Sequence, residues 1–170
     1  MKNLYKKYLA ERESTIFLRL AITAIAVLAA LFFIFVVPNF SREIFIEFPS
    51  ITYPRWLILV GFYGAALPFY IVLFQAMKLL NYIDTNKAFS DLSVQTLRKI
   101  KYAAATTSVV AYALVWPVFY FIAQADDAPG IVIVSFIFMS APMAIGVFAA
   151  VLEKLLRSAI AIKTENELTV

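Results

Sequence analysis

The chain has 170 residues, of which 63% are hydrophobic, and its mean hydropathy is +0.84 with a net charge of +4. Soluble domains are about half apolar, so this excess argues against an ordinary water-soluble fold and favours a membrane protein. Cysteine and histidine are absent, which excludes disulfides, thiolate metal sites, thiol nucleophiles and imidazole acid–base catalysis.

Four apolar runs are long enough to cross about 30 Å of hydrocarbon, which takes roughly 20 helical residues. They cover about residues 16–37, 56–77, 102–123 and 131–152. The first run is too long for the apolar part of a signal peptide, so we expect a permanent span that ends at Pro38 and Asn39. The sequence therefore predicts one membrane domain over residues 1–170, an all-α integral membrane four-helix bundle.

The basic residues are distributed unevenly about these spans. Of the 15 Lys and Arg residues, 12 precede the first span, connect the second and third spans, or follow the fourth, and Arg19 at the inner boundary of the first span makes 13 on that side. Only Arg42 and Arg55 lie on the opposite side. Because cytoplasmic segments are enriched in Lys and Arg, both termini are predicted to be cytoplasmic. Arg19, near the start of the first span, is within snorkelling distance of the membrane surface.

The connection between the second and third spans is predicted to form a helical hairpin that projects on the inner side. Asp84 and Asn86 belong to a turn, and Ser90 is a residue type favoured at a helix N-cap. Lys87 and Phe89 then lie near the tip. The hairpin is either a well-built turn or a docking surface for a cytoplasmic partner.

Two connections are expected on the outer side. Residues 38–55 include the apolar segment 44–48, which is expected to lie in the headgroup layer. This segment either covers the outer mouth of the bundle as a lid or binds a hydrophobic peptide. The second connection is a tight turn that contains Asp126, Asp127, Pro129 and Gly130. Two carboxylates are too few for calcium, which takes about six to eight oxygen ligands. No metal site and no cofactor are predicted.

Small residues and prolines shape the predicted bundle. Gly61 and Gly146 belong to small-residue stretches that let helices approach, within one chain or in a homodimer. Pro68, Pro117 and Pro142 each remove a backbone hydrogen bond inside a span and are expected to bend it. The Ser and Thr hydroxyls of the spans are expected to bond to the preceding turn of their own helix.

Several stretches resemble the YoaS-like family, a group of small bacterial four-helix membrane proteins of unknown function. The matching stretches are residues 78–84, 86–90, 92–94, 100–102, 126–130, 148–152 and 165–170. The resemblance implies a multi-pass protein of the bacterial plasma membrane. It does not imply any enzymatic reaction or any catalytic residue. It also implies a pairing with a small Cro-type helix-turn-helix regulator, because members are often encoded beside one.

The leading hypothesis is a non-enzymatic membrane regulator or sensor that docks a cytoplasmic partner, such as a helix-turn-helix transcription regulator, and does not itself bind nucleic acid. The candidate docking residues are Asn81, Tyr82, Asp84, Asn86, Lys87, Phe89, Ser90 and Lys101. The alternative is immunity to membrane-active peptides or small-molecule permeation, based on the outer apolar segment and the prolines. An enzyme is disfavoured, because no span offers a carboxylate or Lys that could activate a nucleophile.

Overall fold

A computed structural model describes residues 2–47, 49 and 54–168, and the side chains of residues 15–47, 49 and 54–166. Every regular element among these residues is helical. In chain order they are α1 (Lys2–Leu31), η1 (Phe32–Val36), α2 (Val37–Glu47), α3 (Arg55–Asp84), α4 (Asp91–Val110), η2 (Ala111–Val115), α5 (Trp116–Ala125) and α6 (Gly130–Leu168). The elements η1 and η2 are single π-helical turns, each of which joins its neighbouring α-helices without a break.

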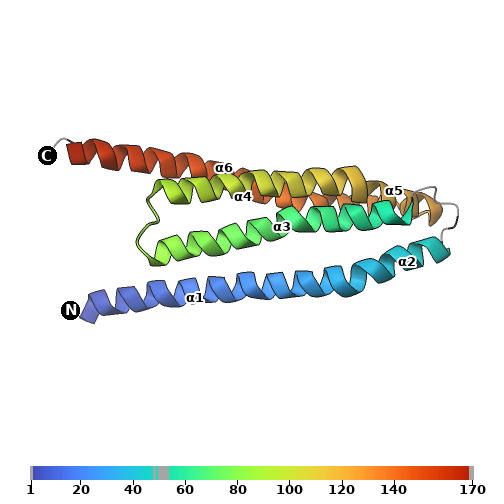
Figure 1. The fold of residues 1–170 in the computed structure, drawn as a ribbon, viewed down its shortest axis with the longest axis horizontal. Helices are drawn as coiled ribbons and strands as arrows, with labels where there is room; N and C mark the ends of the chain where they lie inside the picture. The colour runs from blue at the N-terminus through green and yellow to red at the C-terminus, as the bar shows by residue number, and fades with distance from the viewer. Residues whose placement is uncertain (1, 48, 50–53, 169–170) are drawn as a thin grey trace.

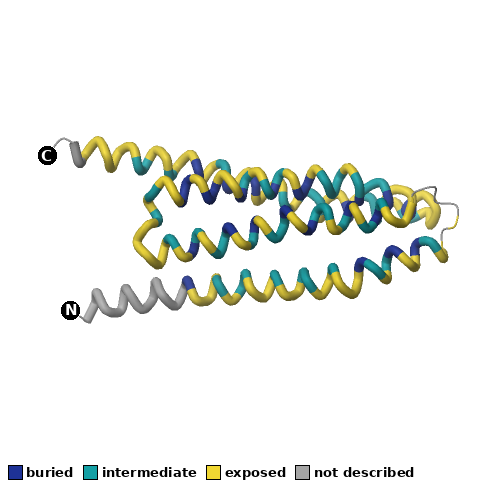
Figure 2. The backbone as a smooth tube through the Cα atoms, viewed as in Figure 1, coloured by how far each residue is buried: buried dark blue, intermediate teal, exposed yellow. Residues whose placement is uncertain are grey.

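Four helical stretches are long and apolar enough to cross a membrane. They are Thr15–Glu47, Arg55–Asp84, Asp91–Ala125 and Gly130–Asn166. Each contains one of the four apolar runs of the sequence and extends beyond it. Large hydrophobic side chains such as Phe17, Leu67 and Phe138 are exposed on the outer surface, and Figure 2 shows that most of residues 16–31 of α1 are exposed or half-buried. Apolar surface on this scale is expected where the surrounding solvent is lipid.

The four stretches run side by side along one axis (Figure 1). The helix α4 packs against both α3 and α6, and α1 packs against α3. Both termini lie at the end that carries the turn between α3 and α4, and α6 extends past that turn. We call this end, with residues 2–14, 84–91 and 153–168, the basic end. The opposite end, with the α2–α3 connection and the α5–α6 turn, is the far end.

The first span does not end at Pro38, so that prediction was wrong. The helix continues through η1 and α2 to Glu47. Proline has no N–H and is tolerated in the first turn of a helix, which is where Pro38 lies in α2. In η1 the N–H of Val37 bonds to the carbonyl of Phe32, five residues back. The Phe33 carbonyl, five residues before Pro38, accepts a hydrogen bond from the Tyr63 hydroxyl of α3 at 2.9 Å.

Pro117 is accommodated in the same way. The π-helical turn η2 ends at Val115, two residues before Pro117, just as η1 ends two residues before Pro38. In both places the change of hydrogen-bond register comes immediately before the residue that has no N–H to donate. Pro68 and Pro142, by contrast, remain inside α3 and α6.

The helix α2 covers the far end of the bundle. Its Ile44 is buried in a cluster with Ile58 of α3 and with Val118 and Ile122 of α5. The hydroxyl of Ser41, also in α2, accepts a hydrogen bond from Arg55 Nε at 3.2 Å. The described part of the apolar segment 44–48 therefore packs as a lid, and Phe48 lies outside the described residues.

Hydroxyl groups in the spans form two kinds of hydrogen bond. Those of Thr23, Thr106 and Thr107 donate to the carbonyl four residues earlier, as predicted. Ser108 departs from this expectation, because its hydroxyl donates to the Met139 carbonyl of α6 at 3.1 Å. The Tyr112 hydroxyl likewise donates to the Phe136 carbonyl of α6 at 3.0 Å. These two bonds join α4 and η2 to α6.

Two glycines lie where helices approach closely. A Cβ atom on Gly61 would lie 2.9 Å from the Cβ atom of Leu114 in η2. A Cβ atom on Gly146 would lie 3.3 Å from the Lys101 carbonyl oxygen of α4. At these positions the predicted packing within one chain is confirmed, and homodimerisation stays a prediction.

We expect Gly61→Ala to lower the melting temperature of the protein in detergent, because overpacking a close contact costs about 1–3 kcal/mol. Gly64→Ala is the matched control on the same helix. A Cβ atom there would lie 3.4 Å from Val110 Cγ1, which is an ordinary contact. Equal melting temperatures for the two variants would contradict the close approach of α3 and η2.

Candidate functional site

The turn between α3 and α4 is fixed by backbone hydrogen bonds. Asn86 has a positive φ of 57°, a left-handed conformation that Asn tolerates. The N–H of Lys87 donates to the Tyr82 carbonyl at 2.8 Å, and the N–H of Asn86 donates to the Ile83 carbonyl at 3.2 Å. These are the two bonds of a Schellman motif. The helix α3 therefore ends where the sequence predicts a turn.

Ser90 occupies the predicted N-cap position of α4, with extended backbone angles. Its hydroxyl has a different role from the one expected. It donates to the Lys87 carbonyl at 2.6 Å, and the Ser93 hydroxyl donates to the same carbonyl at 3.0 Å. The Lys87 carbonyl lies outside both helices and needs hydrogen-bond donors from elsewhere. Both hydroxyls therefore fasten the turn instead of capping the helix.

An ion pair joins α1 to the end of α3. The Arg19 guanidinium donates to Asp84 Oδ2 at 2.7 Å and to Asn81 Oδ1 at 3.0 Å. Charge-assisted bonds from one guanidinium to two acceptors also fix its orientation. Arg19 thus reaches a specific partner and does more than snorkel. Asn81 and Asp84, two of the candidate docking residues, are engaged within the chain.

A second group of charges, which we call the Glu153 cluster, joins α4 to α6. Glu153 is only 6% exposed, and its carboxylate accepts bonds from Arg98 Nε at 3.1 Å, Lys101 Nζ at 2.8 Å and Arg157 at 3.1 Å. One carboxylate faces three cations, so the cluster keeps an excess of positive charge. Spacing along α6 could reveal the Glu153–Arg157 pair, but Arg98 and Lys101 come from a distant part of the sequence.

The structure divides the candidate docking residues into two groups. Five of them hold the turn or the helices together, and these are Asn81, Asp84, Asn86, Ser90 and Lys101. Tyr82 lies near Lys78, whose Nζ is 5.8 Å from the centre of the Tyr82 ring. The side chains of Lys87 and Phe89 are exposed, and that of Phe89 is 65% exposed. The candidate docking residues that remain exposed are therefore few, and they lie on a fixed turn.

The α5–α6 turn at the far end is also closed by a Schellman bond. Asp127 has a positive φ of 49°, and the N–H of Ala128 donates to the Ala123 carbonyl at 3.0 Å. Pro129 and Gly130 lead directly into α6. Within the described part of the chain, no three His, Cys, Asp or Glu residues group closely enough to hold a metal ion. The arrangement of Asp126 and Asp127 is that of a helix-ending turn.

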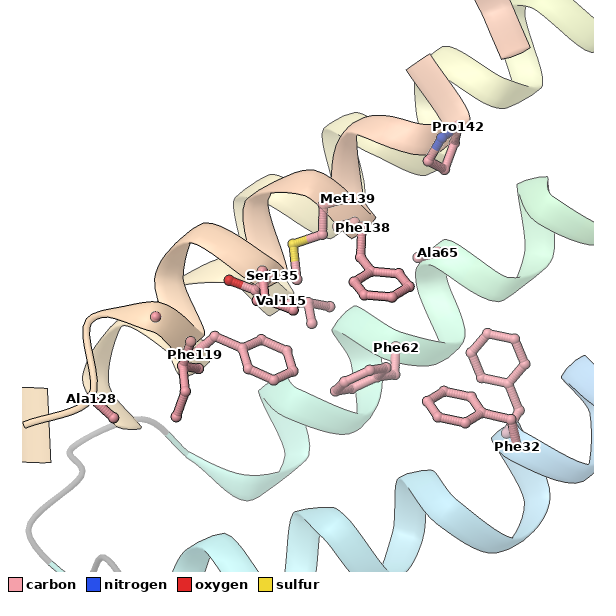
Figure 3. A pocket seen from close by; sticks show the side chains of 15 residues that line it. Phe32, Phe62, Ala65, Val115, Phe119, Ala128, Ser135, Phe138, Met139 and Pro142 are labelled. Carbon is pink, nitrogen blue, oxygen red and sulfur yellow. The ribbon is translucent and has the colours of Figure 1, made fainter. Parts of the chain in front are cut away.

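An apolar cavity of about 710 Å³ lies between the helices near the far end (Figure 3). Its walls include Phe32 of η1, Phe62 and Ala65 of α3, Val115 of η2 and Phe138 of α6. Ser135 supplies the one side-chain hydroxyl of the lining, and that hydroxyl donates to the Val132 carbonyl at 2.9 Å. No sequence pattern pointed to this cavity, because residues from all four helical stretches form it.

Comparison with known proteins places the chain in a family. The family model described as "Protein of unknown function (DUF2975)" matches residues 42–170. The chain belongs to the DUF2975 family. The DUF2975 match begins within α2 and includes the α3–α4 turn, the Glu153 cluster and the α5–α6 turn.

One curated relative of this DUF2975 protein is "Uncharacterized membrane protein YoaS" from Bacillus subtilis (strain 168). The two are 51% identical over 162 residues, which cover 94% of this chain and 99% of the relative. The resemblance to the YoaS-like family is thereby confirmed, and the chain is a multi-pass bacterial membrane protein. No solved structure matches it.

We expect Glu153→Gln to destabilise the protein in detergent. The substitution leaves three cations close together without their carboxylate and weakens three charge-assisted hydrogen bonds, each worth about 1.5–3 kcal/mol when buried and less here because the cations are partly exposed. Asp126→Asn is the matched control, an acid-to-amide change at an exposed position of the far end. The melting temperature should fall for Glu153→Gln and stay near the parent value for Asp126→Asn. Equal values would show that the Glu153 cluster does not hold α4 against α6.

Proposed function

We propose that this chain is a non-enzymatic regulator or sensor of the bacterial plasma membrane that docks a cytoplasmic partner at its basic end. The orientation rests on charge. The termini and the α3–α4 turn share one end of the bundle, and eight of the 15 Lys and Arg residues belong to residues 2–14, 84–91 and 153–168 at that end. Only Arg42 and Arg55 lie in α2 or at the start of α3, toward the far end. The positive-inside rule favours a cytoplasmic position for such an end.

The exposure of Phe89 is the observation that carries the docking proposal. Its side chain is 65% exposed on a turn that stands at the end of the membrane-spanning helices. The hydrogen bonds of Asn86, Lys87, Ser90 and Ser93 fix the backbone on both sides of it. An aromatic side chain on a rigid support loses little conformational entropy on binding, and such residues often anchor interfaces.

The partner that the family resemblance implies is a small helix-turn-helix regulator. A DNA-binding protein held at the membrane is kept away from its operators, so docking and release would form a switch. In this arrangement Phe89 enters an apolar pocket of the partner, and Lys87 meets an acidic group beside it. Signals would reach the partner through the helices α3 and α4 that carry the turn.

The test is co-purification of the intact protein, extracted in detergent, with a small helix-turn-helix regulator of the kind that the family resemblance implies. We expect Phe89→Ala and Lys87→Glu each to remove most of the recovered regulator. Phe148→Ala is the matched control for the first change, because Phe148 is 70% exposed on α6 within the predicted fourth span. Lys99→Glu, at an exposed position of α4, is the control for general loss of positive charge. Unchanged recovery with Phe89→Ala and Lys87→Glu would reject the docking surface.

Immunity to membrane-active peptides or small-molecule permeation is the second candidate, and the apolar cavity is the observation that favours it. The lid argues against a peptide-receiving segment, because Ile44 is already buried against α3 and α5. Permeation of a polar solute also needs polar groups along its path, and the cavity lining offers only Ser135. The regulator therefore has the stronger support.

A further inference from the structure

We propose that the apolar cavity binds one hydrocarbon chain of a bilayer phospholipid as a resident ligand. This proposal is independent of partner docking, because the cavity lies near the far end and the α3–α4 turn lies at the basic end. The proposal rests on the chemistry of the lining, the shape of the cavity and the elements that build it.

The lining selects for hydrocarbon. Its walls are formed by aromatic and aliphatic groups, and the Ser135 hydroxyl already donates to Val132. A polar ligand would find no side-chain donor free to replace the hydrogen bonds that it loses on leaving water. Water itself is disfavoured, because apolar cavities stay dry. An empty cavity would forfeit the dispersion contacts of its walls.

The shape fits an extended chain. Lining residues on α6 run from Gly130 to Pro142, which corresponds to about 18 Å along the helix axis at the helical rise per residue. Phe32 and Phe138 belong to the lining and also have exposed side chains, so the cavity is open toward the membrane on their side. A lipid chain can therefore enter from the bilayer, while the phosphate headgroup stays at the level of the α5–α6 turn.

Both π-helical turns contribute to the walls. Phe32 and Phe33 belong to η1, and Ala111 and Val115 belong to η2. Isolated π-helical turns are rare and often occur at functional sites. Here the two turns lie in separate spans, precede separate prolines and line the same cavity. That coincidence is expected if the cavity is a built site for a ligand rather than a packing defect.

Photo-cross-linking tests the proposal directly. The intact protein is reconstituted into vesicles of phosphatidylethanolamine and phosphatidylglycerol that contain a phospholipid with a diazirine at the middle of one acyl chain. After illumination, mass spectrometry maps the modified residues. We expect modification of Phe62 and Ala65, which line the cavity and are partly exposed, and of Phe148, which faces bulk lipid. Modification of Phe148 without any modification of Val115, Ala65 or Phe62 would overturn the proposal.

Two matched pairs of variants test whether the cavity itself holds the chain. Ala111→Phe fills the cavity from η2, whereas Ala113→Phe makes the same change at an exposed position of the same turn outside the lining. Met139→Trp and Met143→Trp form the second pair on α6, and only Met139 belongs to the lining. The filling variants should lose the cross-links in the cavity and keep those at Phe148, and the controls should keep both.

Each remaining outcome of this experiment has a defined meaning. Cavity cross-links that persist in Ala111→Phe and Met139→Trp at the level of their controls would overturn the proposal. A cavity occupied by a second copy of the chain or by a hydrophobic peptide would exclude the probe, and the absence of cavity cross-links in the parent protein would overturn it too. If one filling variant does not fold, the other variant and the map of the parent protein still decide the question.

Discussion

A backbone that crosses hydrocarbon must satisfy its hydrogen bonds within the protein, and this constraint governs the structure described above. Proline is where the constraint is most severe, since it has no N–H to donate to the carbonyl four residues earlier and its ring also clashes with that carbonyl. The chain meets the difficulty at Pro38 and Pro117 with a π-helical turn placed just before each proline. At Pro38 the Phe33 carbonyl accepts a hydrogen bond from the Tyr63 hydroxyl, so the bond that is missing within one helix is replaced by a bond between two helices.

The same constraint explains how the helices are held together. Lipid provides no hydrophobic drive for helix association, so close approach and polar contacts must supply it. Gly61 and Gly146 permit the close approach, and hydroxyl-to-carbonyl bonds such as that from Ser108 to Met139 join neighbouring helices within the spans. Toward the basic end, where water and headgroups are near, ion pairs between charged side chains hold the helices together. The Arg19–Asp84 pair fixes α1 to α3, and Glu153 fixes α4 to α6.

Much of this architecture follows from local sequence. Apolar runs of about 20 residues identify the spans, and the positive-φ position at Asn86 lies where turn-forming residues cluster. Contacts between distant residues could not be predicted in this way. Nothing near Arg19 indicates that its partners are Asn81 and Asp84, more than 60 residues away. The cavity was missed for the same reason, because its walls are assembled from four stretches of the chain.

The error at Pro38 has a different physical origin. Sequence reasoning treats proline as a helix end, and that is sound when the preceding helix keeps α-helical register up to it. The shift to π-helical register in η1 removes the conflict and lets a new α-helix start with proline in its first turn. The carbonyl that Pro38 leaves without an N–H bonds instead to Tyr63 of another helix, a contact that is not visible in the local sequence.

The central claim is that the bundle spans the bacterial membrane with its basic end in the cytoplasm. The chain has no cysteine, so single-cysteine variants Lys87→Cys and Asp127→Cys can be labelled without background from the protein itself. A membrane-impermeant maleimide added to protoplasts, whose plasma membrane is intact, should label residue 127 at once. Residue 87 should be labelled only after lysis. Labelling of residue 87 but not residue 127 in intact protoplasts would contradict the account.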